Sequence, residues 1–235
     1  MRRAIPGLIG LKELTKYPST PHLPWSPGRS DDDAYLIDVG HLLGKQVVVT
    51  EKMDGENTTM YRDTIHARSL DSRHHPSRDW VKALHGTICS EIPENWRCCG
   101  ENLYARHSIP YFDLSSYFYM FSIWNEDNEA LSWDETIEWA DLLGVDLVPV
   151  LFRGEFEESV LRNLEIDTLR QEGYVIRIED RFPFEDFSHS LAKWVREGHV
   201  QTDQHWMFAE IVPNELATDD ETSSRGIAKG DSAFD

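Results

Sequence analysis

A lysine stands at the end of an apolar segment and is followed at once by residues that favour a turn. The segment QVVVTE occupies residues 46–51, and Lys52, Asp54 and Gly55 come next. The β-branched residues favour a strand, whereas Asp and Gly favour a turn. Burial at a strand end, or neighbouring cations, would lower the pKa of the amine from about 10.4 and expose its lone pair. The pattern therefore indicates a nucleophilic lysine, with a surface ion pair between Lys52 and Asp54 as the ordinary alternative.

Five further segments combine charged or aromatic residues with apolar, strand-like neighbours. In chain order they are HARS at 66–69, GEN at 100–102, FYMFSI at 118–123, EGYVIR at 172–177 and AKWVR at 192–196. Together with KMDG, they resemble the ordered motifs of the covalent nucleotidyltransferase superfamily of ligases and capping enzymes. Within it, the sequence is most similar to the RNA ligase 2-like group, over residues 47–206. Six ordered matches are far more specific than any one of them.

The resemblance implies an ATP-dependent RNA ligase that acts in RNA repair. Such an enzyme joins an RNA 5′-phosphate to a 3′-hydroxyl through a lysyl-AMP intermediate and then an RNA-adenylate. The implied cofactors are ATP and Mg²⁺, with Mn²⁺ as an alternative metal, because phosphoryl transfer depends on charge neutralisation and positioning. The implied partner is RNA with 5′-phosphate and 3′-hydroxyl ends, alone or with an end-healing enzyme or an RNA-binding partner.

The resemblance also assigns five residues to the nucleotide and its metal ion. Lys52 would attack the α-phosphate of ATP and hold AMP as a phosphoramidate, and Lys193 would bind that phosphate. Phe121 would stack on adenine, and Glu51 would lie near the exocyclic edge of the base. Glu172 would hold the metal ion, directly or through water, which suits the preference of Mg²⁺ for oxygen ligands.

Four residues receive roles around the sugar and the RNA. Arg68 and Glu101 would contact the ribose and help to position RNA. Asp54 and Asn57 would serve the later sealing steps. The ordinary alternatives are a surface acid for Glu101 and an ion pair with Asp71 for Arg68.

Two features depart from the family pattern. Many relatives carry two alternating lysines in the last motif, whereas here only Lys193 is present, and strand alternation would place Arg196 on the opposite face. In addition, 51 residues precede Lys52 and 42 follow Lys193, too few for an OB domain on either side. We therefore expect a nearly bare catalytic core that binds RNA weakly or relies on a partner.

The formal net charge of −19 argues against a general affinity for polyanions, since phosphate contacts normally need a basic surface. The acidity is uneven, because residues 126–172 hold 14 acidic and 3 basic residues, whereas residues 52–106 hold eight of each. A basic cluster in the second region is either a face for RNA phosphates or a solvated loop and helix surface. Its members are Arg73, His74, His75, Arg78 and Lys82.

Cysteine usage and the apolar pattern indicate a cytoplasmic protein without a membrane partner. The three cysteines, Cys89, Cys98 and Cys99, make a poor disulfide framework and lack the paired spacing of a zinc site. No apolar run is long enough to cross a bilayer, and the N-terminus MRRAIPGLIG lacks the features of a secretory signal.

Short strand-like and helix-like patterns alternate irregularly, which favours an α+β fold. Strands are expected at 46–51, 117–124, 145–152, 173–178 and 191–195, with a hairpin over 57–69 that turns near Arg62 and Asp63. Helices are expected from Ser77, as the N-cap, to His85, from the capping box of Ser132 and Glu135 to Gly144, and over 156–166. The resemblance adds the architecture of a nucleotidyltransferase (adenylation) domain, with two antiparallel sheets flanking a nucleotide cleft and peripheral helices.

Residues 1–215 are expected to form one catalytic domain, and residues 216–235 a disordered acidic tail. The loop over residues 17–33 carries four prolines and is expected to be irregular but packed on the body. We assign no role to the PHLP sequence at 21–24 within that loop, nor to residues 199–206.

Three other functions remain open at this point. The same chemistry could seal nicked DNA, or form a cap with GTP, although the lack of an OB domain weakens both. A non-catalytic nucleotide-binding or RNA-binding subunit could keep the fold and lose the reaction. The physiological RNA is also open among a nicked duplex, a broken tRNA and single-stranded ends.

Overall fold

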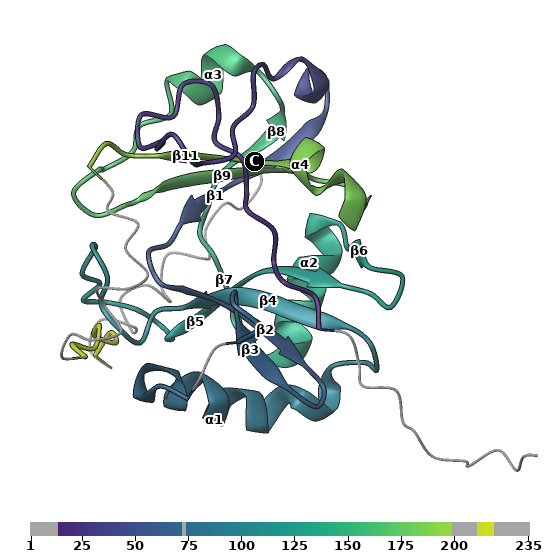
Figure 1. Cartoon of the computed structure of the whole chain (residues 1–235), viewed down its shortest axis with the longest axis vertical. Coiled ribbons are helices and arrows are strands. Elements are labelled where there is room, and N and C mark those ends of the chain that lie inside the picture. Colours follow the sequence, from purple (N-terminus) through teal and green to yellow (C-terminus); the bar gives the residue numbers. More distant parts are fainter. Residues whose placement is uncertain (1–13, 72–73, 199–210, 219–235) are drawn as a thin grey trace, which may run out of the picture.

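The computed structural model describes residues 14–71, 74–198 and 211–218, which build two sheets that lie one above the other (Figure 1). The upper sheet has the strand order β11 (Leu191–Val195), β9 (Gly173–Ile178), β1 (Gln46–Lys52) and β8 (Val150–Glu155). The lower sheet has the order β10 (Phe182–Pro183), β6 (Glu129–Ala130), β5 (Phe118–Trp124), β4 (Arg97–Asn102), β2 (Glu56–Tyr61) and β3 (Ile65–Ala67). Only β7 (Asp146–Leu147), which pairs with β5, is parallel to its neighbour among these strands. The predicted α+β fold with two antiparallel sheets is thus confirmed.

Helices lie at the periphery of these sheets (Figure 1). They are α1 (Asp79–Ile88), α2 (Trp133–Leu143), α3 (Glu158–Arg162) and α4 (Phe187–Ser190), with 3-10 turns at Gly40–Leu42, Pro76–Arg78, Cys89–Glu91 and Phe184–Asp186. The capping box of α2 is confirmed, because Ser132 and Glu135 each accept a backbone N–H from the other. This helix ends at Gly144, whose φ of 63° lies in the left-handed region that favours glycine. Among the described residues, no helix combines the length and the apolarity needed to cross a membrane.

Three predicted elements differ from those observed. Ser77 is not a helix N-cap, because Pro76 starts a 3-10 turn before it and α1 follows only at Asp79. The strand expected at 145–152 is split into β7 and β8, since the chain leaves the lower sheet at Val148 and joins the upper sheet at Pro149. The helix expected over 156–166 is confined to α3.

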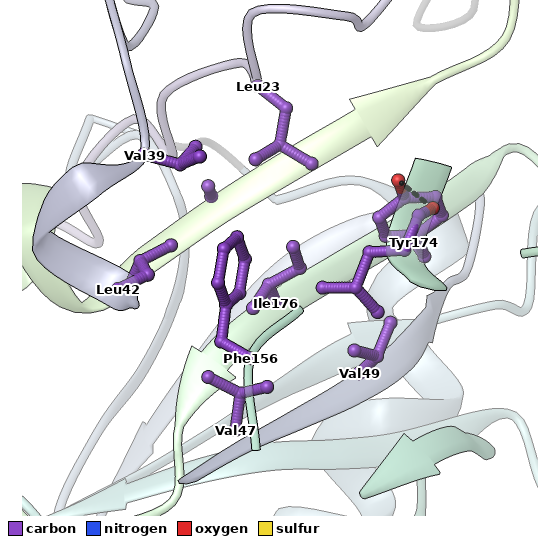
Figure 2. Close-up of a cluster of buried hydrophobic side chains, with 10 residues drawn as sticks. Leu23, Val39, Leu42, Val47, Val49, Phe156, Tyr174 and Ile176 are labelled. Atoms are coloured by element: carbon purple, nitrogen blue, oxygen red, sulfur yellow. Dashed lines mark hydrogen bonds between the residues drawn. The ribbon is translucent and has the colours of Figure 1, made fainter. Parts of the chain in front are cut away.

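Alternation along β1 divides its side chains between two cores. Val47 and Val49 point to the outer face of the upper sheet, where they pack with Leu23, Phe156 and other apolar residues (Figure 2). Val48 points to the inner face, into a cluster that includes Tyr119 of the lower sheet. The outer face of the lower sheet is buried separately against α1. The inner faces therefore hold the side chains that the two sheets share.

The N-terminal loop, residues 17–33, packs on the body as predicted, with Leu23 in the outer core of the upper sheet. The segment leading into it joins both layers, because the Thr15 backbone N–H donates to the Tyr61 hydroxyl of β2, whereas Leu23 donates to Lys193 of β11 (Figure 1). At the other end, Leu216 forms a bridge to Leu114. The rest of the predicted tail, from residue 219, and residues 199–206 lie outside the described residues, as does Arg73.

Candidate active site

Lys52 is the last residue of β1 and lies opposite Gly173 of β9. Its ammonium Nζ lies 2.5 Å from Oε2 of Glu172, the residue that precedes this glycine. The Lys52 side chain is 24% exposed, whereas that of Glu172 is only 1% exposed. The register of β1 with β9 therefore brings together two charges that are 120 residues apart in the sequence.

The charge state of Lys52 corrects the expectation of a lowered pKa. Burial acts to lower the pKa of Lys52, but the carboxylates of Glu172 and Glu101 outweigh burial and raise the pKa above its ordinary value. Without a ligand the side chain is thus an ammonium ion held by Glu172. It can become a nucleophile only when this carboxylate binds another group or when positive charge enters the site and lowers the pKa of the amine.

The turn after Lys52 is fixed by hydrogen bonds to the buried carboxylate of Asp54. The carboxylate of Asp54, 4% exposed, accepts the backbone N–H groups of Ser108 and Ile109 at 2.7 and 2.8 Å and the Ser108 hydroxyl at 2.6 Å. Gly55 lies so close to β4 that a Cβ there would stand 2.5 Å from the carbonyl oxygen of Asn102. Asp54 and Gly55 thus hold the turn against two other segments.

Removing the Asp54 carboxylate should therefore lower stability. We expect Asp54→Ala to lower the free energy of unfolding by about 1–3 kcal/mol, because the buried Ile109 N–H and two part-buried donors of Ser108 lose their acceptor. Urea denaturation measures this, with Asp141→Ala on the exposed side of α2 as the control. A loss no greater than that of the control would show that these hydrogen bonds do not hold the turn.

Glu101 and Asn57 lie opposite each other on β4 and β2. Oε1 of Glu101 accepts the Gly55 backbone N–H at 3.2 Å, and its charge influences Lys52. Burial raises the pKa of Glu101 to about 8, against the opposing effect of Lys52. Oδ1 of Asn57 is buried and has no hydrogen-bond partner among the described residues. Such an orphaned acceptor is an unusual feature that a ligand could satisfy.

Phe121 is placed by a β-bulge. The register of β4 with β5 shifts between Cys99, which faces Ser122, and Gly100, which faces Met120, so that Phe121 has no partner. Bulges re-aim a side chain, and Phe121 is the one residue of β5 that is not fully buried. Its ring packs with inner-face residues and meets the ring of Tyr17 edge-on, with centroids 5.2 Å apart.

Lys193 of β11 lies opposite Val175 of β9, on the same face as Lys52 and Thr50. Burial and the charge of Lys52 lower the pKa of Lys193 to about 8. The exposed Arg68 donates to Oγ of Ser19 in the N-terminal loop, and its charge also influences Lys193. Two amines and one guanidinium thus converge on this side of the site.

The positions of Glu51 and Arg196 depend on neighbours that the motifs alone did not reveal. Alternation turns Glu51 to the opposite face of β1 from Lys52, where its carboxylate accepts Nε2 of Gln171 at 2.9 Å. Arg196 follows the last residue of β11, so that strand alternation no longer decides its orientation. Its Nη2 lies 3.4 Å from Oγ of Ser108, the residue that holds Asp54.

The donor set fits a magnesium-type ion bound mainly by substrate. Among the described residues, no group of three His, Cys, Asp or Glu side chains could hold a metal on its own. Glu172 and Glu101, whose charges both act on Lys52, could supply one or two carboxylate oxygens. Mg²⁺ and Mn²⁺ are commonly bound through one or two carboxylates, water and substrate phosphates, which agrees with such a sparse site.

The basic cluster around α1 lies apart from Lys52. Arg78 is tied to Glu56 by two hydrogen bonds, one of them 2.7 Å from Nε to Oε2. A cavity of about 200 Å³ opens between Arg78, Lys82 and β3, on the outer face of the lower sheet.

The residues at this site that the sequence analysis missed are Tyr17, Ser108 and Gln171, because none of them lies in a recognised motif.

Comparisons with known proteins agree with this picture at the level of the family. A protein-family model described as RNA ligase matches residues 45–195. Two solved structures of an RNA ligase from Naegleria gruberi, one with PPi and one a variant with ATP and Mn, are 21% and 20% identical, with TM-scores of 0.47 and 0.46. Each alignment covers 67% of this chain and 51% of the Naegleria chain, so this chain spans about half of their length. No curated protein matches the chain.

Proposed function

This chain belongs to the RNA ligase family, and from that premise we propose that it is an ATP-dependent ligase acting through a lysyl-AMP intermediate. The observation that carries the proposal is the position of Lys52. Its amine contacts Glu172 and is influenced by the charge of Glu101, and the charges of Lys52 and Arg68 both influence Lys193. Five of the six motifs, spread over more than 140 residues of sequence, thus supply one set of charges suited to phosphoryl transfer.

In the first step, Nζ of Lys52 attacks the α-phosphorus of ATP, a P–N bond forms, and the bond to pyrophosphate breaks. The ammonium must first lose a proton to solvent water, and its bond to Glu172 opposes this loss. A divalent cation, when bound, supplies positive charge for the phosphates. Engagement of Glu172 by that cation would lower the pKa of Lys52 and so free the lone pair. Lys193 holds the α-phosphate as its negative charge shifts.

In the second step, a 5′-phosphate oxygen of RNA attacks the AMP phosphorus, and the P–N bond breaks to restore the Lys52 amine. In the third step, the 3′-hydroxyl attacks the activated 5′-phosphate, and AMP leaves. We assign Asn57 to these steps because its buried Oδ1 has a free lone pair to offer a hydroxyl group. Asp54 contributes by fixing the turn, since its carboxylate is engaged by Ser108 and Ile109.

The charge of Lys193 gives this reaction a pH dependence. An amine with a pKa of about 8 is charged below that pH and neutral above it. Because Lys52 must lose a proton whereas Lys193 must keep one, the kcat/KM for ATP in adduct formation should rise with pH up to about 8 and level off above it. In Lys193→Arg the rise should continue above pH 8, since a guanidinium stays charged. The pH profile of both proteins is the measurement, and the same levelling in both would assign it to another group, such as Glu101.

The proposed function is tested by incubating the protein with α-labelled ATP and either Mg²⁺ or Mn²⁺. The label should become covalently bound to the protein and should pass to 5′-phosphorylated RNA, which is then sealed to a 3′-hydroxyl. Replacing ATP by GTP, and RNA by DNA at each side of a nick, separates the capping-type and DNA-ligase alternatives. ATP binding without any covalent label would instead identify a non-catalytic nucleotide-binding protein.

A further inference from the structure

The PHLP sequence of the N-terminal loop lies along the edge of β11 at Lys193. The backbone N–H of Lys193 donates to the carbonyl of Pro21 at 2.9 Å, and the N–H of Leu23 donates to the carbonyl of Lys193 at 2.8 Å. On the other side, Lys193 is paired with Val175 of β9. The backbone of Lys193 is thus held from both sides, and His22 is the residue opposite it.

The side chain of His22 extends this hold to the end of the strand. Its ring is fully buried, and Nδ1 lies 2.9 Å from Oγ of Ser26. That same Oγ accepts the backbone N–H of Val195 at 2.9 Å. The Ser26 hydroxyl can therefore donate its hydrogen to Nδ1 while it receives the N–H of β11. His22 thus lies in the chain between the two residues that bond Lys193, and hydrogen bonds through Ser26 link its ring to the backbone of Val195.

The second ring nitrogen is directed by a carboxylate. Nε2 of His22 lies 3.6 Å from Oδ2 of Asp33, which itself accepts the Ser30 backbone N–H and hydroxyl at 2.9 and 2.7 Å. This neighbour favours the tautomer with its proton on Nε2, which leaves Nδ1 free to accept from Ser26. Burial and the charges of Lys193, Lys52 and Arg29 lower the pKa of His22 to about 4, against the effect of Asp33. The ring is neutral at physiological pH.

The loop cannot easily take another position on β11. Gly28 donates its N–H to the Val195 carbonyl at 2.9 Å, and a Cβ at Gly28 would lie 2.3 Å from the carbonyl oxygen of Arg196. Only a residue without a side chain allows this approach. The loop therefore packs closely against β11, the strand that carries Lys193.

We propose that His22 is a positioning residue. It fixes the backbone position of Lys193 in β11, so that the ammonium group of Lys193 can bind the α-phosphate beside Lys52. The inference rests on the proposed function, since it names what sets the geometry of that site. His22 acts through the backbone of β11 and through Ser26, and it touches no reacting atom.

Adduct formation from α-labelled ATP and Mg²⁺ tests the inference through a double-mutant cycle. His22→Ala should raise the KM for ATP about tenfold while kcat falls less, because a correctly placed cation is lost from substrate binding. His22→Asn, whose side-chain oxygen can take the place of Nδ1, should recover most of the loss. Adding His22→Ala to Lys193→Ala should change KM by less than about twofold, because residues that act as one unit are not additive. The control is His189→Gln, an exposed histidine of α4.

A readout without ATP separates this inference from the proposed function. Acetic anhydride labelling followed by mass spectrometry gives the pH at which the Lys193 amine becomes reactive. This pH should lie near 8 in the natural protein and should rise by about one unit in His22→Ala, as the amine relaxes towards water. Ser26→Ala, which keeps the ring but breaks its link to Val195, should give a smaller rise and serves if His22→Ala does not fold.

The outcomes differ for the two claims. If the natural protein forms no adduct, the proposed function fails, and the labelling experiment still decides the role of His22. An unchanged labelling profile in both variants, or effects of His22→Ala and Lys193→Ala that simply add, would overturn the positioning role.

Discussion

Lys52→Ala should eliminate covalent AMP on the protein, with a loss of at least about 10³-fold in the rate of adduct formation. The side chain provides the only protein atom proposed to bond to phosphorus. Of the nearby cations, Lys193 lies on a different strand, β11, and Arg68 carries a guanidinium that stays protonated. The measurement is covalent label from α-labelled ATP, followed by mapping of the labelled peptide. Lys52→Arg should be equally inactive, since a guanidinium stays protonated.

The matched control for this prediction is Lys45→Ala. Lys45 is exposed and stands just before β1, so that it shares the strand but not the site. It should keep the activity of the natural protein. Label that persists on Lys52→Ala, or that maps to another lysine, would show that Lys52 is not the nucleophile.

Glu172→Gln should make the Lys52 amine more reactive towards acetic anhydride but slow adduct formation from ATP. Without the buried carboxylate at 2.5 Å, burial and Lys193 should lower the pKa of Lys52, so that its amine reacts faster with acetic anhydride at pH 8. Adduct formation from ATP should nevertheless fall by about 100-fold or more, because the carboxylate proposed to engage the metal ion is lost. A merely structural role for Glu172 would predict only loss of folded protein, which thermal unfolding detects.

The control for Glu172 is Glu179→Gln at the end of β9. Glu179 is 23% exposed and pairs with Arg153, so its loss removes a surface ion pair worth about 1 kcal/mol or less. Adduct formation should be unchanged in this variant. Natural-level adduct formation by Glu172→Gln would contradict the metal-binding role, and an unchanged reactivity of Lys52 would contradict the ion pair.

The predictable part of the fold rests on local patterns. The β-branched run before Lys52 and the capping box at Ser132 each depend on residues within one turn or strand, and the structure contains both elements. The prediction that Ser77 is a helix N-cap was wrong for an equally local reason, since Pro76 starts a 3-10 turn one residue earlier. The break at Val148 and Pro149 could not be predicted, because it depends on two sheets competing for one segment.

The site was only partly predictable, because charge states depend on distant neighbours. Nothing near Lys52 in the sequence reveals that Glu172 lies 2.5 Å from its amine, and this neighbour reverses the expected direction of the pKa change. In the same way, Phe121 could be named from its motif, but the bulge that turns it inward and the ring of Tyr17 beside it depend on pairing across the sheet.

The crossing at Val148 and Pro149 has a mechanical consequence. Val148 donates to Met120 of β5, whereas Pro149 accepts from Glu51 of β1, so one peptide unit, about 3.8 Å between Cα atoms, joins the two layers. Met120 and Glu51 are the sequence neighbours of Phe121 and Lys52, respectively. The two layers are therefore joined directly beside both Phe121 and Lys52. This junction restricts changes in the distance between the Phe121 ring, which we propose stacks on adenine, and the Lys52 amine, which we propose attacks ATP.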